Sequence, residues 1–381
     1  MAHCAEVARC AEVARHFEFE GDFLIARPYG CGHINDTYVV RCRTAGGVTR
    51  RYTLQRINHH VFQDPEALTR NIEAVTAHLR RKVLAAGGDP ERETLTLVPA
   101  ENGRTLHRTD DGDYWRAYLF IEGARTYESA ESLEQVYSAA QAFGRFQELL
   151  SDFPSDRLHE TIPDFHNTPK RFAACVEAVE RDAHNRARAA AAEIAFVTQR
   201  AGEVSILVDL LNQGALPERV THNDTKLNNV MIDDETGIGI CVIDLDTVMP
   251  GLSLYDFGDS VRSSGNPAAE DERDLAKVGI DLAVFDALTR GYLEATRGFL
   301  TPAEVNLLPF SARLMTLECG MRFLTDHLNG DVYFKTHREN HNLDRCRTQF
   351  KMVADMEEKF GEMVGVVERY RWGGCERQAE C

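Results

Sequence analysis

The sequence lacks the long apolar runs that membrane spans and secretory signals require. It contains no stretch of about 18 apolar residues, and no basic region followed by an apolar one begins it. Positive charge is also scarce, because 43 lysines and arginines stand against 60 aspartates and glutamates, for a formal charge of −17. This imbalance disfavours binding to nucleic acid or to an anionic membrane. We therefore predict a cytoplasmic protein with neither kind of partner.

Cysteine pairs at the spacing of metal ligands are missing as well. The ten cysteines are scattered from Cys4 to Cys381, which predicts reduced thiols and neither a zinc site nor a disulfide framework. A six-residue repeat at 4–9 and 10–15 is too short for a repeat architecture. We interpret residues 1–18 as a helical N-terminal extension, and the polar end of the chain, residues 371–381, as a tail.

Residues 19–122 are rich in short β-branched and aromatic runs separated by glycine. These runs predict antiparallel strands, at 23–26, 37–42, 52–57, 95–98 and 114–121. Between them, apolar residues recur at helical spacing over 65–86, which predicts one long helix with a buried face. This region is therefore expected to be a small, nucleotide-binding β lobe with a single long helix.

Residues 123–370 show mostly helical periodicity. Helices are predicted at 133–150, 169–200, 203–211, 253–262, 275–298, 302–328 and 342–370. One β-rich patch interrupts them, where 230–232 and 240–243 flank a turn-forming acidic segment. A small antiparallel β lobe ahead of a large, mainly helical lobe with one hairpin indicates an α+β, bilobal, protein-kinase-like fold.

The strongest chemical signal is the segment Thr-His-Asn-Asp-Thr-Lys-Leu-Asn-Asn at 221–229. Phosphoryl transfer to a hydroxyl needs a carboxylate to orient the nucleophile and accept its proton, with a carboxamide oxygen nearby for Mg²⁺. Asp224 and Asn229 stand five positions apart, as in the catalytic loop of kinases, where a histidine precedes them. We predict Asp224 as the catalytic base, Asn229 as a metal ligand, and Lys226 as a positive charge for the transferring phosphate.

A second acidic segment, Ile-Asp-Leu-Asp-Thr at 243–247, ends the predicted hairpin. A carboxylate at a strand end suits Mg²⁺ bound beside nucleotide phosphates, so Asp244 is the second predicted metal ligand. Three roles stay open for Asp246: a further metal ligand, a substrate contact or a helix N-cap. Asp256 and Asp259 follow, and we expect one or the other to hold the catalytic loop by hydrogen bonds or to cap a helix.

The glycines of Tyr-Gly-Cys-Gly-His-Ile-Asn at 29–35 suit a turn over nucleotide phosphates. They make Gly30, Gly32 and Asn35 candidates for nucleotide binding. Kinases carry a phosphate-binding lysine on the third strand, but Gln55 stands at that position here. Phosphate neutralisation is therefore expected to depend on the catalytic-loop lysine, Mg²⁺ and backbone amides.

Two further expectations follow from the strands of the small lobe. The segment Tyr-Leu-Phe-Ile-Glu-Gly at 118–123 is the predicted hinge, with Phe120 and Glu122 beside the adenine. Side chains alternate along a strand, so Arg56 is expected to face away from Gln55.

These motifs resemble those of the aminoglycoside phosphotransferase/choline kinase superfamily, and the bacterial N-acetylhexosamine 1-kinases in particular. The resemblance runs over residues 19–367, with matching stretches at 28–37, 221–229, 243–251, 256–260 and 317–323. It implies transfer of phosphate from ATP, with Mg²⁺, to the anomeric hydroxyl of an N-acetylhexosamine. It also implies sugar contacts at His33, Arg322 and Tyr333.

Alternatives to this interpretation remain open. A protein kinase is disfavoured, because nearly a hundred residues separate the hinge from the catalytic loop and no Ala-Pro-Glu follows Asp244. The enzyme alternative is a kinase of another small alcohol, such as choline, an aminoglycoside or a different sugar. The non-enzyme alternative is a nucleotide-binding pseudokinase, suggested by Gln55. In each case the partners are small molecules, and we expect a monomer or weak oligomer.

Overall fold

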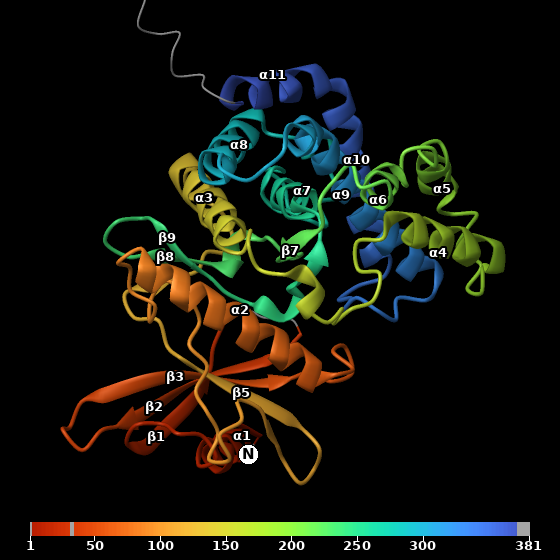
Figure 1. Cartoon of the computed structure of the whole chain (residues 1–381). Coiled ribbons are helices and arrows are strands. Elements are labelled where there is room, and N and C mark those ends of the chain that lie inside the picture. The colour runs from red at the N-terminus through yellow and green to blue at the C-terminus, as the bar shows by residue number, and fades with distance from the viewer. Residues whose placement is uncertain (1, 31–33, 372–381) are drawn as a thin grey trace, which may run out of the picture.

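The structure, a computed structural model, describes residues 2–30 and 34–371. It has a small lobe built on an antiparallel sheet and a larger helical lobe (Figure 1). The sheet strands in the described residues lie in the order β1-β2-β3-β5-β4. They are β1 (Asp22–Pro28), β2 (Asp36–Arg43), β3 (Thr49–Ile57), β4 (His107–Arg108) and β5 (Tyr114–Leu119). The predicted α+β, bilobal fold is confirmed.

The long helix α2 (Pro65–Ala85) lies between this sheet and the large lobe (Figure 1). Asp64 caps its N-terminus by accepting the amide of Ala67 at 2.8 Å. Its predicted apolar face is buried, in one hydrophobic cluster with helix α3 (Leu133–Leu149) and the hairpin of the large lobe. The core is therefore continuous between the lobes, which holds the small lobe against the site described below.

Helix α1 (Ala2–Ala14) packs against the face of the sheet turned away from the large lobe (Figure 1). Cys10 and Val13 are buried in one cluster with Leu54 and Trp115 of the sheet. Since full burial of a valine side chain contributes about 1.5–3 kcal/mol, the N-terminal helix stabilises the small lobe.

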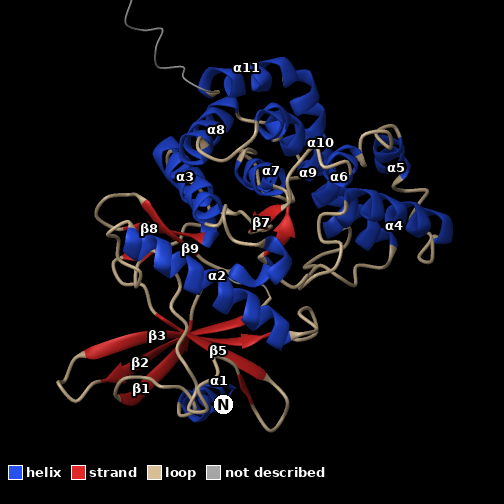
Figure 2. Ribbon diagram, in the orientation of Figure 1, coloured by secondary structure: helices blue, strands red, loops and turns tan. Residues whose placement is uncertain are grey.

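Short strands lie in the part of the large lobe next to α2, with most of that lobe's helices above them in the view (Figure 2). Strand β7 (Arg219–Thr221) pairs with β10 (Met249–Gly251), and β8 (Val230–Asp233) forms the predicted hairpin with β9 (Gly239–Val242). The helices beyond α3 are α4 (Thr168–Arg181), α5 (Ala191–Thr198), α6 (Ile206–Asn212), α7 (Ser253–Ser264), α8 (Leu282–Thr296), α9 (Pro302–Leu328), α10 (His341–Glu358) and α11 (Phe360–Tyr370). Within residues 2–30 and 34–371, none of the helices combines the length and apolar character of a membrane span.

Two of the predicted helices are each divided in the structure. The helix predicted over 169–200 is α4 and α5, because Asp182 and Asn185 have positive φ angles of 35° and 55° that a continuing helix does not allow. The helix predicted over 342–370 is α10 and α11, which meet at Lys359. Both predictions of one continuous helix were wrong, since helical periodicity does not reveal a single residue that turns the chain.

Two further segments differ from prediction. Helix α8 begins at Leu282 and not at 275, because Asp281 caps it by accepting the amides of Ala283 and Val284. The strand predicted over 95–98 is reduced to a single bridge between Leu97 and Tyr118.

Candidate active site

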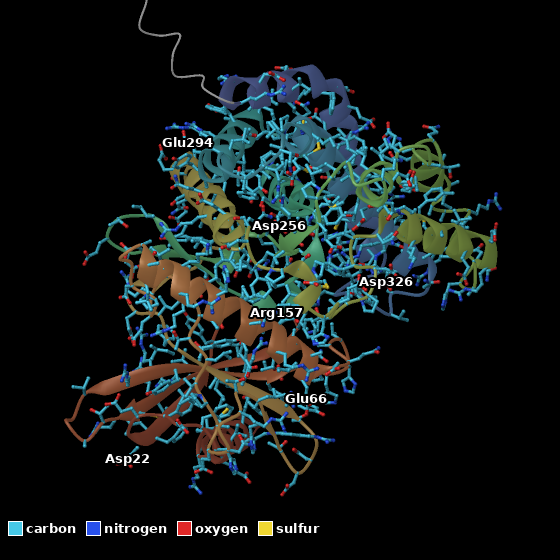
Figure 3. All side chains as sticks on the ribbon, viewed as in Figure 1. Asp22, Glu66, Arg157, Asp256, Glu294 and Asp326 are labelled. Atoms are coloured by element: carbon cyan, nitrogen blue, oxygen red, sulfur yellow. The ribbon has the colours of Figure 1, made fainter. Side chains whose placement is uncertain are left out.

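The catalytic loop follows β7 and is held in place by helix α7. Asp256 accepts hydrogen bonds from the backbone amides of His222 (2.9 Å) and Asn223 (2.7 Å). Asp259 accepts one from the amide of Thr225 at 2.8 Å. Figure 3 shows Asp256 in the middle of the large lobe. The predicted hydrogen bonding of an aspartate to the loop is confirmed, and both aspartates take part in it, so the loop backbone is fixed on a rigid helix.

Asp224 lies in this loop beside the other two residues predicted with it. Its Oδ1 is 2.7 Å from Nζ of Lys226, and its Oδ2 accepts from Nδ2 of Asn229 at 3.2 Å. Burial opposes the charge of Asp224, but the ammonium of Lys226 outweighs it, so the pKa of Asp224 is lowered. Asp224 is therefore a carboxylate at neutral pH, held in a defined orientation.

The segment after β9 is hydrogen-bonded directly to the catalytic loop. The carbonyl oxygen of Asn229 accepts the amide of Ile243 at 2.9 Å, and His222 donates from Nε2 to the carbonyl oxygen of Ile243 at 2.9 Å. Asp244 then adopts a left-handed conformation, with φ 59° and ψ 57°. Such backbone is uncommon outside glycine and is enriched at functional sites. The segment that carries Asp244 is thus fixed next to Asn229.

Asp244 and Asn229 fit a Mg²⁺ ion. In the described residues the Asp244 side chain has no hydrogen-bond or ion-pair partner. The Asn229 amide nitrogen is bound to Asp224, which leaves its oxygen for a metal. Partial desolvation between the lobes, and then the charges of Asp246 and Asp224, raise the pKa of Asp244 to about 6. A divalent cation would relieve this crowding of negative charge.

Protein ligands alone do not form a metal cluster here. Among the described residues, no three histidine, cysteine or acidic side chains converge on one point. The remaining ligands of a Mg²⁺ ion would therefore come from nucleotide phosphates and water, as is usual for Mg²⁺ at phosphoryl-transfer sites.

Asp246 is buried where the two lobes meet. Its Oδ1 lies 2.5 Å from Nη1 of Arg116 on β5, and its Oδ2 accepts from Nδ2 of Asn35 at 2.6 Å. Asp246 lies within the short helix η3 (Leu245–Thr247), whose N-cap position belongs to Asp244. Asp246 therefore joins the large lobe to two side chains of the small lobe.

Arg116 is the residue of this junction that the sequence analysis did not identify. It stands opposite Gln55 in the antiparallel register of β3 and β5, and its side chain is 1% exposed. Burial opposes its charge, but the carboxylate of Asp246 outweighs it and keeps the pKa of Arg116 raised. An arginine inside a buried strand was the available signal, because arginine is almost never fully buried without a partner. Arg56 faces the other way, as predicted, and pairs with Asp113 at 3.1 Å.

The turn between β1 and β2 carries the predicted phosphate-binding residues. Gly30 has a φ of 75°, which glycine adopts without strain. Gly32 and His33 lie outside the described residues. Asn35 accepts the backbone amide of Asn58 at 3.0 Å, in addition to its bond with Asp246, so the end of this turn is tied to the large lobe.

The predicted hinge residues are partly engaged by neighbouring side chains. The guanidinium of Arg51 lies 4.0 Å from the ring of Phe120, and Tyr29 meets that ring edge-on at 5.5 Å. Glu122 forms a two-point ion pair with Arg51. Its carboxylate is therefore already bound and the Phe120 ring is buried, whereas Tyr29 is an exposed aromatic residue beside the turn.

Arg322, on α9, lies among three aromatic rings. Its guanidinium carbon is 5.0 Å from the ring of Phe165, 5.6 Å from Phe334 and 6.0 Å from Tyr333. In the part of the chain that the structure describes, Arg322 makes no hydrogen bond or ion pair. The structure thus brings Arg322 and Tyr333 together, and adds Phe165 and Phe334, which the sequence analysis did not name.

The loop that carries Tyr333 is held by Asp326 of α9. Its carboxylate accepts the backbone amides of Val332 (2.9 Å), Tyr333 (2.8 Å) and Phe334 (2.9 Å). Asn342 donates to the same carboxylate at 2.8 Å. Figure 3 shows Asp326 on the side of the large lobe near α4. The loop backbone is therefore fixed, although the Tyr333 side chain is 58% exposed.

His166 connects this aromatic cluster to the catalytic loop. Its Nδ1 is 2.7 Å from Oε1 of Glu318, and its Nε2 is 3.2 Å from the carbonyl oxygen of Asn223. Glu318 precedes Arg322 by one helical turn on α9. Arg322 is thus placed one turn from a side chain that reaches, through His166, the residue before Asp224. Sequence spacing gave no sign of this link.

A comparison with models of protein families identifies the family of this chain. A family model described as "Phosphotransferase enzyme family" matches residues 25–292. The chain belongs to this family. The phosphotransferase match includes the catalytic loop and Asp244, whereas Arg322 and Tyr333 lie beyond its end.

Solved structures of kinases share the fold of this phosphotransferase. A microcompartment-associated aminopropanol kinase is 17% identical in sequence, with a TM-score of 0.58. The alignment covers 94% of this chain and 98% of the aminopropanol kinase chain. A choline kinase from Cryptosporidium parvum Iowa II is 12% identical, with 95% and 97% covered and a TM-score of 0.55. An amicoumacin kinase in complex with AMP-PNP and Ca²⁺ is also 12% identical, with 90% and 92% covered and a TM-score of 0.55. At these identities the likeness establishes the protein-kinase-like fold.

A cavity of about 980 Å³ lies elsewhere on this phosphotransferase, between α3, α8 and α11. Its lining includes Tyr137, Asp286 and Arg369, and none of the residues described above. The candidate active site is therefore defined by its converging side chains and not by the volume of a cavity.

Proposed function

We propose that this phosphotransferase moves the γ-phosphate of ATP, with Mg²⁺, onto the anomeric hydroxyl of an N-acetylhexosamine such as GlcNAc or GalNAc. The observation that carries the proposal is the position of Arg322 beside Tyr333. Glu318, one helical turn before Arg322, is linked through His166 to the residue before Asp224. The amicoumacin kinase structure, which contains AMP-PNP and Ca²⁺, supports the nucleotide and divalent cation.

In this reaction Asp224 accepts the proton of the anomeric hydroxyl while that oxygen attacks the γ-phosphorus, and the bond from phosphorus to the ADP oxygen breaks. Lys226 neutralises the charge that develops on the phosphoryl oxygens. Arg322 and Tyr333 hold the sugar ring so that its anomeric oxygen faces Asp224. When bound by Asp244 and Asn229, Mg²⁺ would supply further charge neutralisation.

The charges around Arg322 disfavour a cationic acceptor such as choline or an aminoglycoside. Arg322 already occupies the faces of the aromatic rings that would receive an ammonium group. Burial, and then the charge of Arg322, lower the pKa of Arg171, although Glu318 opposes this shift, so two guanidinium groups lie close together here. A neutral sugar, whose hydroxyl and acetamido oxygens accept hydrogen bonds, fits better. The presence of Asp224 with both metal ligands argues against a pseudokinase.

The acceptor hydroxyl can be tested with two sugar analogues. A 1,5-anhydro-N-acetylhexosamine lacks the anomeric oxygen but keeps the other polar contacts, so it should inhibit without being phosphorylated. A 6-deoxy analogue should still be phosphorylated, because one lost hydrogen bond costs only about 0.5–1.5 kcal/mol. The measurement is phosphate incorporation from ATP, with choline and an aminoglycoside as comparison acceptors. Phosphorylation of the anhydro sugar alone would show that another hydroxyl is the acceptor.

Arg322→Ala is expected to raise the Michaelis constant for the sugar at least about tenfold, since a hydrogen bond from a charged group contributes about 1.5–3 kcal/mol. The constant for ATP should change less than about twofold, because Arg322 is assigned to the acceptor. Steady-state kinetics with each substrate varied in turn give both values. Arg313→Ala is the matched control, since Arg313 is on the same helix but pairs with Glu203 and Glu357. Equal increases for both substrates would remove Arg322 from the sugar site.

A further inference from the structure

Gln55 is oriented by both ends of its amide. Its Nε2 donates to Oγ1 of Thr37 at 3.0 Å, so its oxygen points the other way. That oxygen accepts two hydrogen bonds from Arg116, from Nε at 3.0 Å and from Nη2 at 2.9 Å. Gln55, at the position of the usual kinase lysine, therefore has no charge of its own, but it is hydrogen-bonded to the guanidinium of Arg116 on the neighbouring strand.

The third nitrogen of Arg116 is not satisfied in the same way. Its Nη1 lies 2.5 Å from Oδ1 of Asp246, yet within the described residues neither atom has a hydrogen-bond partner of acceptable geometry. Both side chains are almost fully buried, at 1% and 3% exposed. The charge on Nη1 is therefore paired with a carboxylate, but no well-aligned hydrogen bond fixes the direction of its N–H groups, although buried charged groups are normally hydrogen-bonded.

The side chain of Arg116 lies on the face of the sheet that is turned towards the large lobe. Alternation along β5 puts Arg116 and Tyr118 on the sheet face that Gln55 shares, towards the large lobe, while Trp115 and Ala117 pack on the opposite side with α1. Asp246 follows Asp244 by two residues. The guanidinium of Arg116 also lies near enough to Asp244 to act on the pKa of that carboxyl, so it stands beside the segment that carries the predicted metal ligand.

We propose that Arg116, held by Gln55 and Asp246, supplies from β5 the positive charge for the nucleotide phosphates that kinases usually supply from a lysine on β3. Nη1 carries two N–H groups, so one can stay on Asp246 and the other can donate to a phosphate oxygen, while Nε and Nη2 stay on Gln55. A guanidinium suits this place, because it remains charged when buried and matches phosphate geometry. The inference rests on the proposed function only for the use of a nucleotide, and not for the identity of the acceptor.

Binding measured without any sugar tests this inference. The variant Arg116→Met/Asp246→Asn removes both buried charges, so neither partner is left unpaired. Calorimetry with MgADP should show roughly a tenfold to hundredfold loss of affinity, as expected for one lost charge-assisted contact to phosphate. Adenosine, which has no phosphate, should bind with unchanged affinity. If the Arg116–Asp246 pair only joined the two lobes, the variant would lose affinity for both MgADP and adenosine or for neither. Either outcome would overturn the proposal.

Restoring a lysine provides the second arm. Adding Gln55→Lys to that variant should recover most of the lost MgADP affinity, since it puts a cation back at the usual position on β3. A folded triple variant without recovery would count against a role in phosphate binding. If the double variant does not fold, Arg116→Lys replaces it, and it should weaken MgADP but not adenosine, because an ammonium cannot span Gln55 and a phosphate at once. No change in either ligand would contradict the inference. Failure of the sugar assays would leave these binding results intact.

Discussion

Asp224→Asn is expected to lower kcat by at least about a hundredfold, because a positioned general base contributes about 10²–10⁴ to the rate. Asparagine keeps the shape of the side chain, and its amide oxygen can still accept from Lys226, but it cannot take the proton of the acceptor hydroxyl. Nucleotide affinity should remain close to that of the native enzyme. Single-turnover phosphate transfer and MgADP calorimetry measure the two effects separately.

Asp234→Asn is the matched control for that experiment. Asp234 lies in the turn of the β8–β9 hairpin, where it pairs with Arg125 at 2.5 Å and takes no part in the site. Its substitution should leave kcat within about twofold of native, as surface changes usually do. If folded Asp224→Asn turns over at a comparable rate, Asp224 is not the base.

Asp244→Asn should make the enzyme more stable to heat and less able to bind Mg²⁺-nucleotide. The stability effect has a definite sign. A carboxyl whose pKa is raised to about 6 on folding is costly to ionise above that pH, so removing the charge at pH 7.5 removes a repulsion with Asp224 and Asp246. Asparagine also tolerates the left-handed backbone of this position. The affinity for Mg²⁺-nucleotide should fall roughly a hundredfold, since the ion loses its charged protein ligand.

A melting curve and a Mg²⁺ titration of nucleotide binding give both results for one protein. We expect a higher melting temperature together with weaker Mg²⁺ dependence, because a functional site crowded with like charges reduces the stability of the fold in order to bind the metal. Unchanged Mg²⁺ dependence would shift the metal role from Asp244 to Asp246. A lower melting temperature would show that the Asp244 carboxylate stabilises the fold, contrary to its raised pKa.

Local sequence was enough to predict which residues of the catalytic loop lie together. Asp224, Lys226 and Asn229 are close in the chain, so a short loop before a hairpin brings them together whatever the rest of the fold does. The same holds for Asp244, which the hairpin returns to the side of Asn229. The long helix α2 was also predictable, because a regular apolar face and a capping aspartate are local features.

Only the tertiary structure decided which distant side chains complete the site. Arg116 and Gln55 are 61 positions apart and meet because β3 and β5 pair in one particular register. Tyr333 lies near Arg322 because Asp326 accepts hydrogen bonds from three backbone amides of the loop that carries Tyr333. His166 contacts Glu318, which is 152 positions further along the chain. The sequence by itself determined the loop that we propose performs phosphoryl transfer, since its geometry is set by neighbours in the chain. The surroundings of that loop depend on strand pairing and helix packing, whose energies come from contacts between segments that no local pattern relates.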